Sequence, residues 1–236
     1  MLQTASLTVK RYICAHLLAD FVFQPQWLSN KKTEKFFSLY HILHIAVVWV
    51  FAYVFSMDPG FWIAASMIAV FHMLTDVMKS WLIRKWPTKN HFFADQFIHL
   101  AIIVVVVLAY NHYYGVDLIY DIRPHTAAVI TAFVLNAKPA NIIIKNLFDV
   151  FSIQVANDHT QAISEGLPNA GKIIGIVERF IALALIIMGQ YAAVGLIVAA
   201  KSILRFQDPL KNEYVLIGTL LSFGIAIISG ILIHAI

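Results

Sequence analysis

The stretch HILHIAVVWVFAYVFS, residues 41–56, sets two histidines at the start of an apolar run that contains no Asp, Glu, Lys or Arg. Such a run is typical of a transmembrane helix, because about 20 apolar residues in a helix span the hydrocarbon core of a bilayer. His41 and His44 are three residues apart and therefore project from one face of that helix. Ionisable side chains are costly in hydrocarbon, so this pair is a functional candidate.

The same arrangement recurs in three other apolar segments of the first hundred residues. The further pairs are His16/Asp20, His72/Asp76 and Asp95/His99, each spaced by four residues. Four such pairs favour a shared site over scattered packing contacts. The alternative is that polar side chains join membrane helices through hydrogen bonds of about 1 kcal/mol or less, and His44, beside the apolar run, fits that role best.

The composition excludes several classes of protein. At 60% hydrophobic and 13% charged residues, the chain is not a soluble globular domain. The sole cysteine, Cys14, excludes an intrachain disulfide and any multi-cysteine metal site. A net charge of +4, placed mostly in short loops, indicates membrane orientation rather than nucleic-acid binding.

The hydrophobic pattern predicts an all-α fold, a polytopic transmembrane helical bundle of about eight spans. Lys138-Pro139 predicts a kink in the fifth span, which alternatively ends there and continues as a surface helix. We expect a four-helix His/Asp-containing membrane domain at 1–111, a loop, kinked helix and polar segment at 112–168, and a three-helix membrane segment at 169–236. The predicted spans are residues 12–28, 38–56, 61–83, 92–111, 126–153, 173–189, 191–206 and 214–236.

Basic residues cluster in alternate loops, which the positive-inside rule places in the cytoplasm. The clusters are Lys31/Lys32/Lys35, Arg84/Lys85/Lys89 and Arg205/Lys211. This orientation brings all four His/Asp pairs to a common depth near the inner boundary of the membrane. HLLADFVFQ (16–24) also matches HMLTDVMKS (72–80) as H-x3-D, which indicates a repeat of two N-terminal helical hairpins.

Imidazole and carboxylate are ligands for Zn, Mn and Fe, and helical pairs deliver two ligands each. The sequence therefore predicts a site for a divalent transition metal, Zn, Mn or Fe, although a proton or ion pathway uses the same residue types. We expect Asp95 or His41 to act as general base or further ligand, and Gln24 to position a water. The predicted metal ligands are His16, Asp20, His72, Asp76 and His99.

A second charged cluster lies in the C-terminal third. One interpretation is an ion pair between Glu178 and Lys201, with Arg179 and Arg205 reaching toward lipid headgroups. The other is an anion-binding rim that holds a phosphate near the metal. Its residues would be Lys79, Arg179, Lys201 and Arg205.

The runs HLLADFVFQPQWLSNKK, HILH, HMLTDVMK and FFADQFIHL resemble a bacterial inner-membrane family, domain of unknown function 3307. The stretch from GKIIGIVERF through AAKSILRF to EYVLIGTLLS is similar to the tail of its longer members. The resemblance implies a multi-pass protein of the bacterial inner (plasma) membrane and supplies no activity. The H-x3-D helices also resemble bacterial membrane-bound metal-dependent hydrolases, by analogy alone.

The leading hypothesis is a metal-dependent hydrolase acting on an amphiphilic anionic substrate, such as a lipid or lipid-linked phosphate, at the cytoplasmic leaflet. The alternatives are a transporter or proton/ion-conducting protein that uses the His/Asp cluster as a relay, and a non-catalytic scaffold subunit. The expected partners are the lipid bilayer and that substrate, with no nucleic acid. A homo-oligomer is left open.

Overall fold

The computed structural model describes residues 2–34, 37–86, 88–115, 122–153, 170–205 and 212–235, which are helical with no strand among them. The chain divides into two compact units, 1–131 and 132–236, and α6 (Pro124–Asn136) begins in the first and ends in the second.

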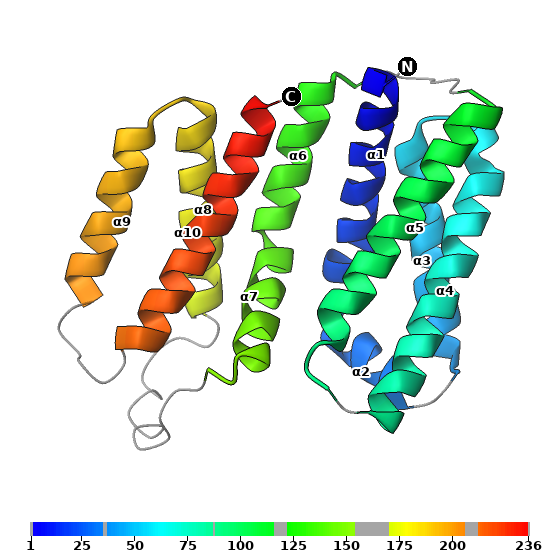
Figure 1. Cartoon of the computed structure of the whole chain (residues 1–236), viewed down its shortest axis with the longest axis horizontal. Coiled ribbons are helices and arrows are strands. Elements are labelled where there is room, and N and C mark those ends of the chain that lie inside the picture. Colours follow the sequence, from blue (N-terminus) through cyan, green and yellow to red (C-terminus); the bar gives the residue numbers. More distant parts are fainter. Residues whose placement is uncertain are drawn as a thin grey trace. The chain divides into compact units, whose positions relative to one another are not determined.

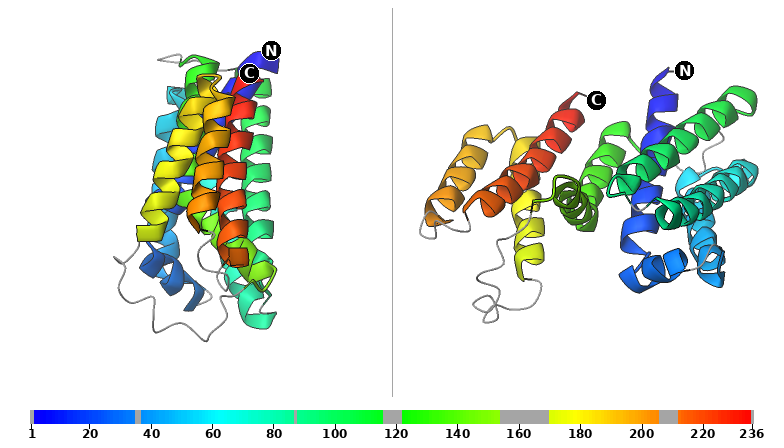
Figure 2. Two further views of the ribbon diagram at one scale, coloured as in Figure 1. Left: turned by 90° about the vertical axis from the view of Figure 1, so that its left-hand side faces the viewer. Right: turned by 60° about the horizontal axis from the view of Figure 1, so that its bottom comes forward.

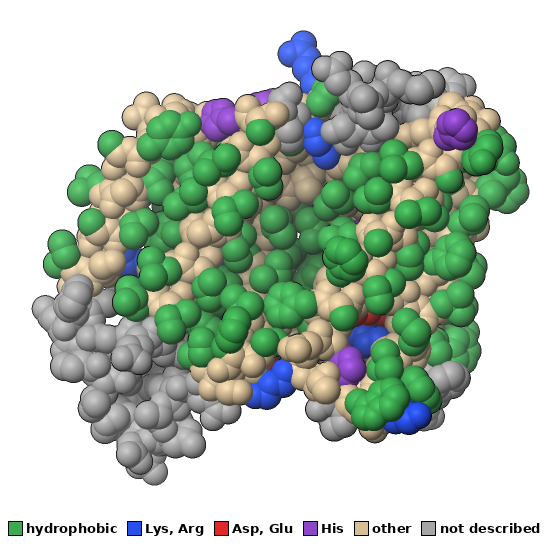
Figure 3. All heavy atoms as spheres, viewed as in Figure 1, with side chains coloured by type: hydrophobic (Ala, Val, Ile, Leu, Met, Phe, Trp, Pro, Cys, Tyr) green, Lys and Arg blue, Asp and Glu red, His purple; other side chains and the backbone are tan. Residues whose placement is uncertain are grey.

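Among the residues that the structure describes, four helices are long and apolar enough to cross a membrane. They comprise α3 (Leu39–Ser56), η2 with α4 (Pro59–Phe61 and Trp62–Lys85), α5 (His91–Tyr113) and most of α10 (Asn212–His234). The bent pair α6 and α7 (Lys138–Val150) would add a fifth span. Hydrophobic side chains cover most of the helix surface drawn in Figure 3. The eight predicted segments each contain a described helix or helix pair, but only four of them, or five with the bent pair, are long and apolar enough to cross a membrane.

Unit 1 contains an antiparallel four-helix bundle. Helix α1 (Leu2–Leu17) packs on α3 and α5, and α4 packs on the same two helices (Figure 1). The apolar core of the bundle gathers Val48, Ala52, Ile68, Ile103 and Val107. At one end, Asp58 caps η2 by accepting the Gly60 N–H and also accepts a bond from the Tyr110 hydroxyl, which ties the α3–α4 turn to α5.

The first helix differs from the predicted span at 12–28. It begins at Leu2, passes into a π-helical turn at Leu18–Val22, labelled η1, and stops before Pro25. A separate helix, α2 (Gln26–Glu34), follows and packs on α3 and α4. Proline lacks an N–H and clashes with the preceding helical turn, so the chain restarts at Pro25 rather than continuing.

Unit 2 packs α8 (Ala170–Ile187) against α7, α9 (Tyr191–Arg205) and α10 (Figure 2). Helices α6 and α7 meet at a bend of 50°, which confirms the kink predicted at Lys138-Pro139. Gly189, with φ +73°, ends α8 in the left-handed conformation that glycine adopts without strain. The bend leaves backbone carbonyls at the end of α6 that need partners outside their own helix.

Candidate metal centre

The four predicted His/Asp pairs meet in one cluster at the end of the unit 1 bundle that carries α2. Helices α1 and α4 run toward α2, and their pairs lie at the end of α1 and in the second half of α4 (Figure 1). Helices α3 and α5 run away from α2, and their pairs lie at the start of each helix. All four pairs therefore converge near α2. Seven of these side chains are in mutual contact, each with no more than 9% of its surface exposed. They are His16, Asp20, His44, His72, Asp76, Asp95 and His99.

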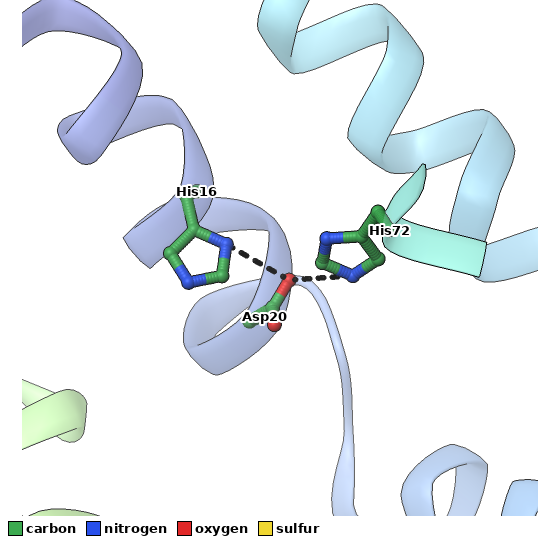
Figure 4. A group of neighbouring side chains, drawn as sticks. All are labelled: His16, Asp20 and His72. Atoms are coloured by element: carbon green, nitrogen blue, oxygen red, sulfur yellow. Dashed lines mark ion pairs between the residues drawn. The ribbon is translucent and has the colours of Figure 1, made fainter. Parts of the chain in front are cut away.

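Asp20 Oδ1 faces three imidazoles, two of which Figure 4 shows. It lies 3.6 Å from His16 Nδ1, 3.4 Å from His44 Nε2 and 3.5 Å from His72 Nε2. The Nε2 atoms of His44 and His72 are 3.1 Å apart. Asp20, His44 and His72, which we term the Asp20 triad, therefore bring three ligand-type atoms into a triangle with sides of 3.1, 3.4 and 3.5 Å.

Asp20 lies within the π-helical turn η1, in which the Phe23 N–H donates to the Leu18 carbonyl at 2.8 Å. Single π turns are rare and occur often at functional sites. Here the turn carries the carboxylate while α1 carries His16 one turn earlier. The irregular backbone thus coincides with the centre of the cluster.

Two lysines partly neutralise the carboxylates. Lys32 on α2 buries its ammonium against Asp76 Oδ2 at 2.5 Å. Lys79 on α4 pairs with Asp95 Oδ2 at 2.7 Å, and its side chain remains 28% exposed. Three carboxylates and two ammonium groups give the cluster a charge of −1 when its imidazoles are neutral.

Hydrogen bonds orient two of the imidazoles. His99 Nδ1 donates to the backbone carbonyl of Asp95 at 2.8 Å, so in the neutral ring Nε2 carries the lone pair. His16 Nε2 lies 3.2 Å from Gln96 Oε1. A histidine that binds a metal through one ring nitrogen usually donates the N–H of its other ring nitrogen to a backbone carbonyl or a side-chain oxygen.

Several buried polar atoms of the cluster make no hydrogen bond with the described residues. They are His16 Nδ1, His44 Nδ1, His99 Nε2 and Asp95 Oδ1. Leaving a buried polar group unsatisfied costs about 1–3 kcal/mol. Besides the Asp20 triad, three combinations of described residues place ligand-type atoms within 4.8 Å of one another: His16/Asp20/His72, His44/His72/Asp76 and Asp76/Asp95/His99. The cluster therefore has the donors and the spacing to bind a cation.

An apolar core closes the cluster on the side away from α2. A cavity of about the volume of one water molecule lies against His16 and His72 and is otherwise lined mainly by apolar side chains, including Val48 and Ile68. Tyr12 also lines this cavity, and apart from it and the two histidines the lining side chains are apolar.

His41 and Gln24 lie at the margin of the cluster. His41 Nδ1 accepts the Ser38 N–H at 3.2 Å at the start of α3, and its Nε2 lies 3.5 Å from Ser80 Oγ. Of the two residues predicted as general base or further ligand, Asp95 therefore lies in the cluster and His41 at its margin, and the role itself stays a prediction. Gln24 is half-buried just beyond η1, and its role in positioning a water stays a prediction.

His44, a member of the cluster, and Lys32, which pairs with Asp76, were not predicted as site residues. His44 was interpreted as a packing residue, although its i,i+3 spacing from His41 placed it one turn deeper, level with the other pairs. Lys32 was counted only as a basic loop residue that sets orientation. A lysine has a stem long enough to carry its ammonium into a site from a surface helix, so sequence position alone does not identify it.

In unit 2, Lys201 pairs with Glu178, the partner that the sequence analysis gave it. Arg179 is buried and donates to the backbone carbonyls of Asn136 and Ala137. It also bonds Ser222 Oγ at 2.9 Å and Asn141 Oδ1 at 2.7 Å. Arg179 thus satisfies the carbonyls at the α6–α7 bend, and these four acceptors enclose its guanidinium group. These contacts give Arg179 a structural role, and the anion-binding role stays a prediction. The side chain of Arg205 lies outside the described residues.

The fold and the cluster define a helical bundle that has helices able to cross a membrane and encloses a buried His/Asp centre. Residues 9–149 match the family described as Protein of unknown function (DUF3307), and the chain belongs to that family. The match includes all seven cluster residues. The C-terminal stretches that resemble the family lie outside the matched residues. No curated protein and no solved structure matches the chain.

Proposed function

We propose that this chain is a multi-pass protein of the bacterial inner membrane that binds a divalent transition metal in unit 1. We further propose that it uses the metal to hydrolyse an amphiphilic anionic substrate at the cytoplasmic leaflet. The observation that carries the proposal is the Asp20 triad, a buried carboxylate oxygen facing two imidazole nitrogens at 3.4 and 3.5 Å.

The triad has the dimensions of a metal site. Tetrahedral zinc ligands at about 2.0–2.1 Å from the ion are about 3.3–3.4 Å from one another. The triangle sides of 3.1, 3.4 and 3.5 Å bracket that value. Asp76 Oδ2, 3.8 Å from His44 Nε2 and 3.9 Å from His72 Nε2, is placed to be a further ligand. Mixed imidazole and carboxylate donors suit Zn, Mn and Fe.

The charge of the cluster supports hydrolysis of an anionic substrate. A single divalent cation changes the cluster from −1 to +1. A hydroxide or an anionic substrate group would then restore neutrality in a buried setting where net charge is costly. A bound metal of this type lowers the pKa of its water and polarises an ester or phosphoryl oxygen.

The position of the cluster supports a substrate that lies at the cytoplasmic surface of the membrane. Lys85, at the end of α4, lies over the exposed rings of Trp81 and Trp86 at 4.9 and 4.6 Å. Tryptophan and basic side chains are enriched where a span leaves the bilayer on its cytoplasmic side. Asp76 and His72 lie about two and a half and three and a half helical turns before this end of α4, and the partly exposed Lys79 lies between Asp76 and that end.

A proton or ion relay is the second candidate, because the imidazoles form a continuous series. Ring centroids are 5.6 Å apart for His16 and His99, 3.9 Å for His99 and His72, and 5.1 Å for His72 and His44. The apolar core beyond the cluster weighs against a path across the membrane. Proton flux into proteoliposomes that is lost with Asp76→Asn would favour the relay; the hydrolase proposal expects no such flux.

The test is metal content followed by turnover. Full-length protein purified in detergent is stripped with a chelator, reloaded with Zn²⁺, washed and analysed by mass spectrometry. We expect bound zinc in the wild type and in His112→Ala, which removes an exposed histidine from the far end of α5. We expect loss of zinc in Asp20→Ala and His72→Ala.

Turnover is measured as phosphate released from vesicles that contain phosphatidic acid. Release by the zinc-loaded wild type, absent from Asp20→Ala and retained by His112→Ala, is the expected result. A wild type that retains no stoichiometric metal would overturn the proposal. A metal-loaded protein that releases no phosphate would overturn hydrolysis of this substrate.

A further inference from the structure

We infer that unit 1 holds a second divalent cation beside the first, on Asp76, Asp95 and His99, and that the Lys79 ammonium competes with this cation for Asp95. The inference rests on the proposed metal centre and extends it to a two-metal site. Ligand-type atoms of the three residues lie within 4.8 Å of one another, and none of the three belongs to the Asp20 triad.

Two of these residues have a buried polar atom that makes no hydrogen bond with the described residues and could coordinate a cation. Asp95 Oδ1 and His99 Nε2 are buried and have no hydrogen-bond partner among the described residues. Asp95 Oδ2, in contrast, accepts from Lys79 and from Gln96 Nε2 at 3.1 Å. His99 is held by its Nδ1 bond to the Asp95 carbonyl, an arrangement that prepares the other nitrogen for a metal.

Asp76 connects the two sets of ligands. Its Oδ2 is 3.8 Å from His44 Nε2 and 3.9 Å from His72 Nε2, while its carboxylate also belongs to the group with Asp95 and His99. A carboxylate has two oxygens and can therefore bridge two ions. Two-metal hydrolytic sites hold their ions about 3.5–4 Å apart and clamp both the attacking and the leaving oxygen.

The lysines explain how a second cation is accommodated. With both ammonium groups in place, two divalent cations would give the cluster a charge of +3. Lys79 is 28% exposed and can move its ammonium to solvent, which lowers this charge to +2, whereas Lys32 is buried against Asp76. A phosphate monoester dianion would balance +2, so the two-metal site selects that substrate class.

The test is isothermal titration of Zn²⁺ into chelator-stripped, full-length protein in detergent. We expect two equivalents in the wild type and the loss of one, the weaker, in Asp95→Asn. Lys79→Gln should tighten the weaker site by about tenfold or more, because a cation no longer competes for the Asp95 carboxylate. Lys85→Gln removes an exposed ammonium from the same helix and should leave both affinities unchanged.

Mn²⁺ provides a second readout that does not depend on activity. Two Mn²⁺ ions sharing Asp76 should give an exchange-coupled paramagnetic resonance spectrum in the wild type and an uncoupled one in Asp95→Asn. One equivalent of zinc in the wild type, with no change in affinity for Lys79→Gln, would overturn the inference while leaving the single-metal hydrolase intact. Absence of any bound metal would overturn both.

Discussion

Lys32→Met tests whether the buried ion pair with Asp76 supports unit 1. At the observed 2.5 Å, two unit charges attract by about 7 kcal/mol with an effective dielectric constant of about 20. Desolvation offsets much of that attraction, but removing one partner leaves an uncompensated buried charge and costs about 3–5 kcal/mol. We therefore expect Lys32→Met to lower the free energy of unfolding of the metal-free protein by about 3–5 kcal/mol.

The assay is denaturant unfolding in mixed micelles, in the presence of a chelator. Lys31→Met is the matched control, because it removes the same charge from an exposed neighbour on α2 and should cost less than about 1 kcal/mol. Adding Asp76→Asn to Lys32→Met should restore most of the loss, since the unpaired carboxylate is then gone. A Lys32→Met protein as stable as Lys31→Met would refute the buried pair.

Two further predictions concern unit 2. In Gly230→Ala the new Cβ would lie 2.4 Å from Ile186 Cγ2, so we expect a loss of about 1–3 kcal/mol, measured by the same unfolding assay. Gly224→Ala on the same helix meets nothing within 4 Å and should be neutral or stabilising; equal losses in the two variants would contradict the packing. Arg179→Lys cannot reproduce the fork that bonds four acceptors and should cost about 3 kcal/mol or more, whereas exposed Lys172→Met should cost little.

The sequence predicts the helices and most of the cluster because both follow from local spacing. Apolar runs locate the spans, and i,i+3 or i,i+4 pairs place His and Asp on one helix face. Alternating orientation then brings those faces to a common depth. The π turn at Asp20 has no comparable signal in the sequence. A π turn differs from an α turn by one additional residue, which changes the backbone hydrogen bonds but not the hydrophobic pattern.

The contacts that the sequence does not predict are those made between distant segments. Pro139 predicts the bend in α6 and α7, but not that Arg179, far along the chain, supplies the donors for the carbonyls freed there. Lys32 likewise belongs by composition to a basic loop, and only the packing of α2 on α4 brings its ammonium to Asp76.

X-ray absorption at the zinc edge, on protein loaded with one equivalent of Zn²⁺, asks whether the Asp20 triad binds metal. We predict about two imidazoles and oxygen ligands at about 2.0–2.1 Å, with the imidazole signal reduced in His44→Ala and unchanged in His112→Ala. A spectrum with oxygen ligands alone, identical in wild type and His44→Ala, would contradict a metal site in this cluster.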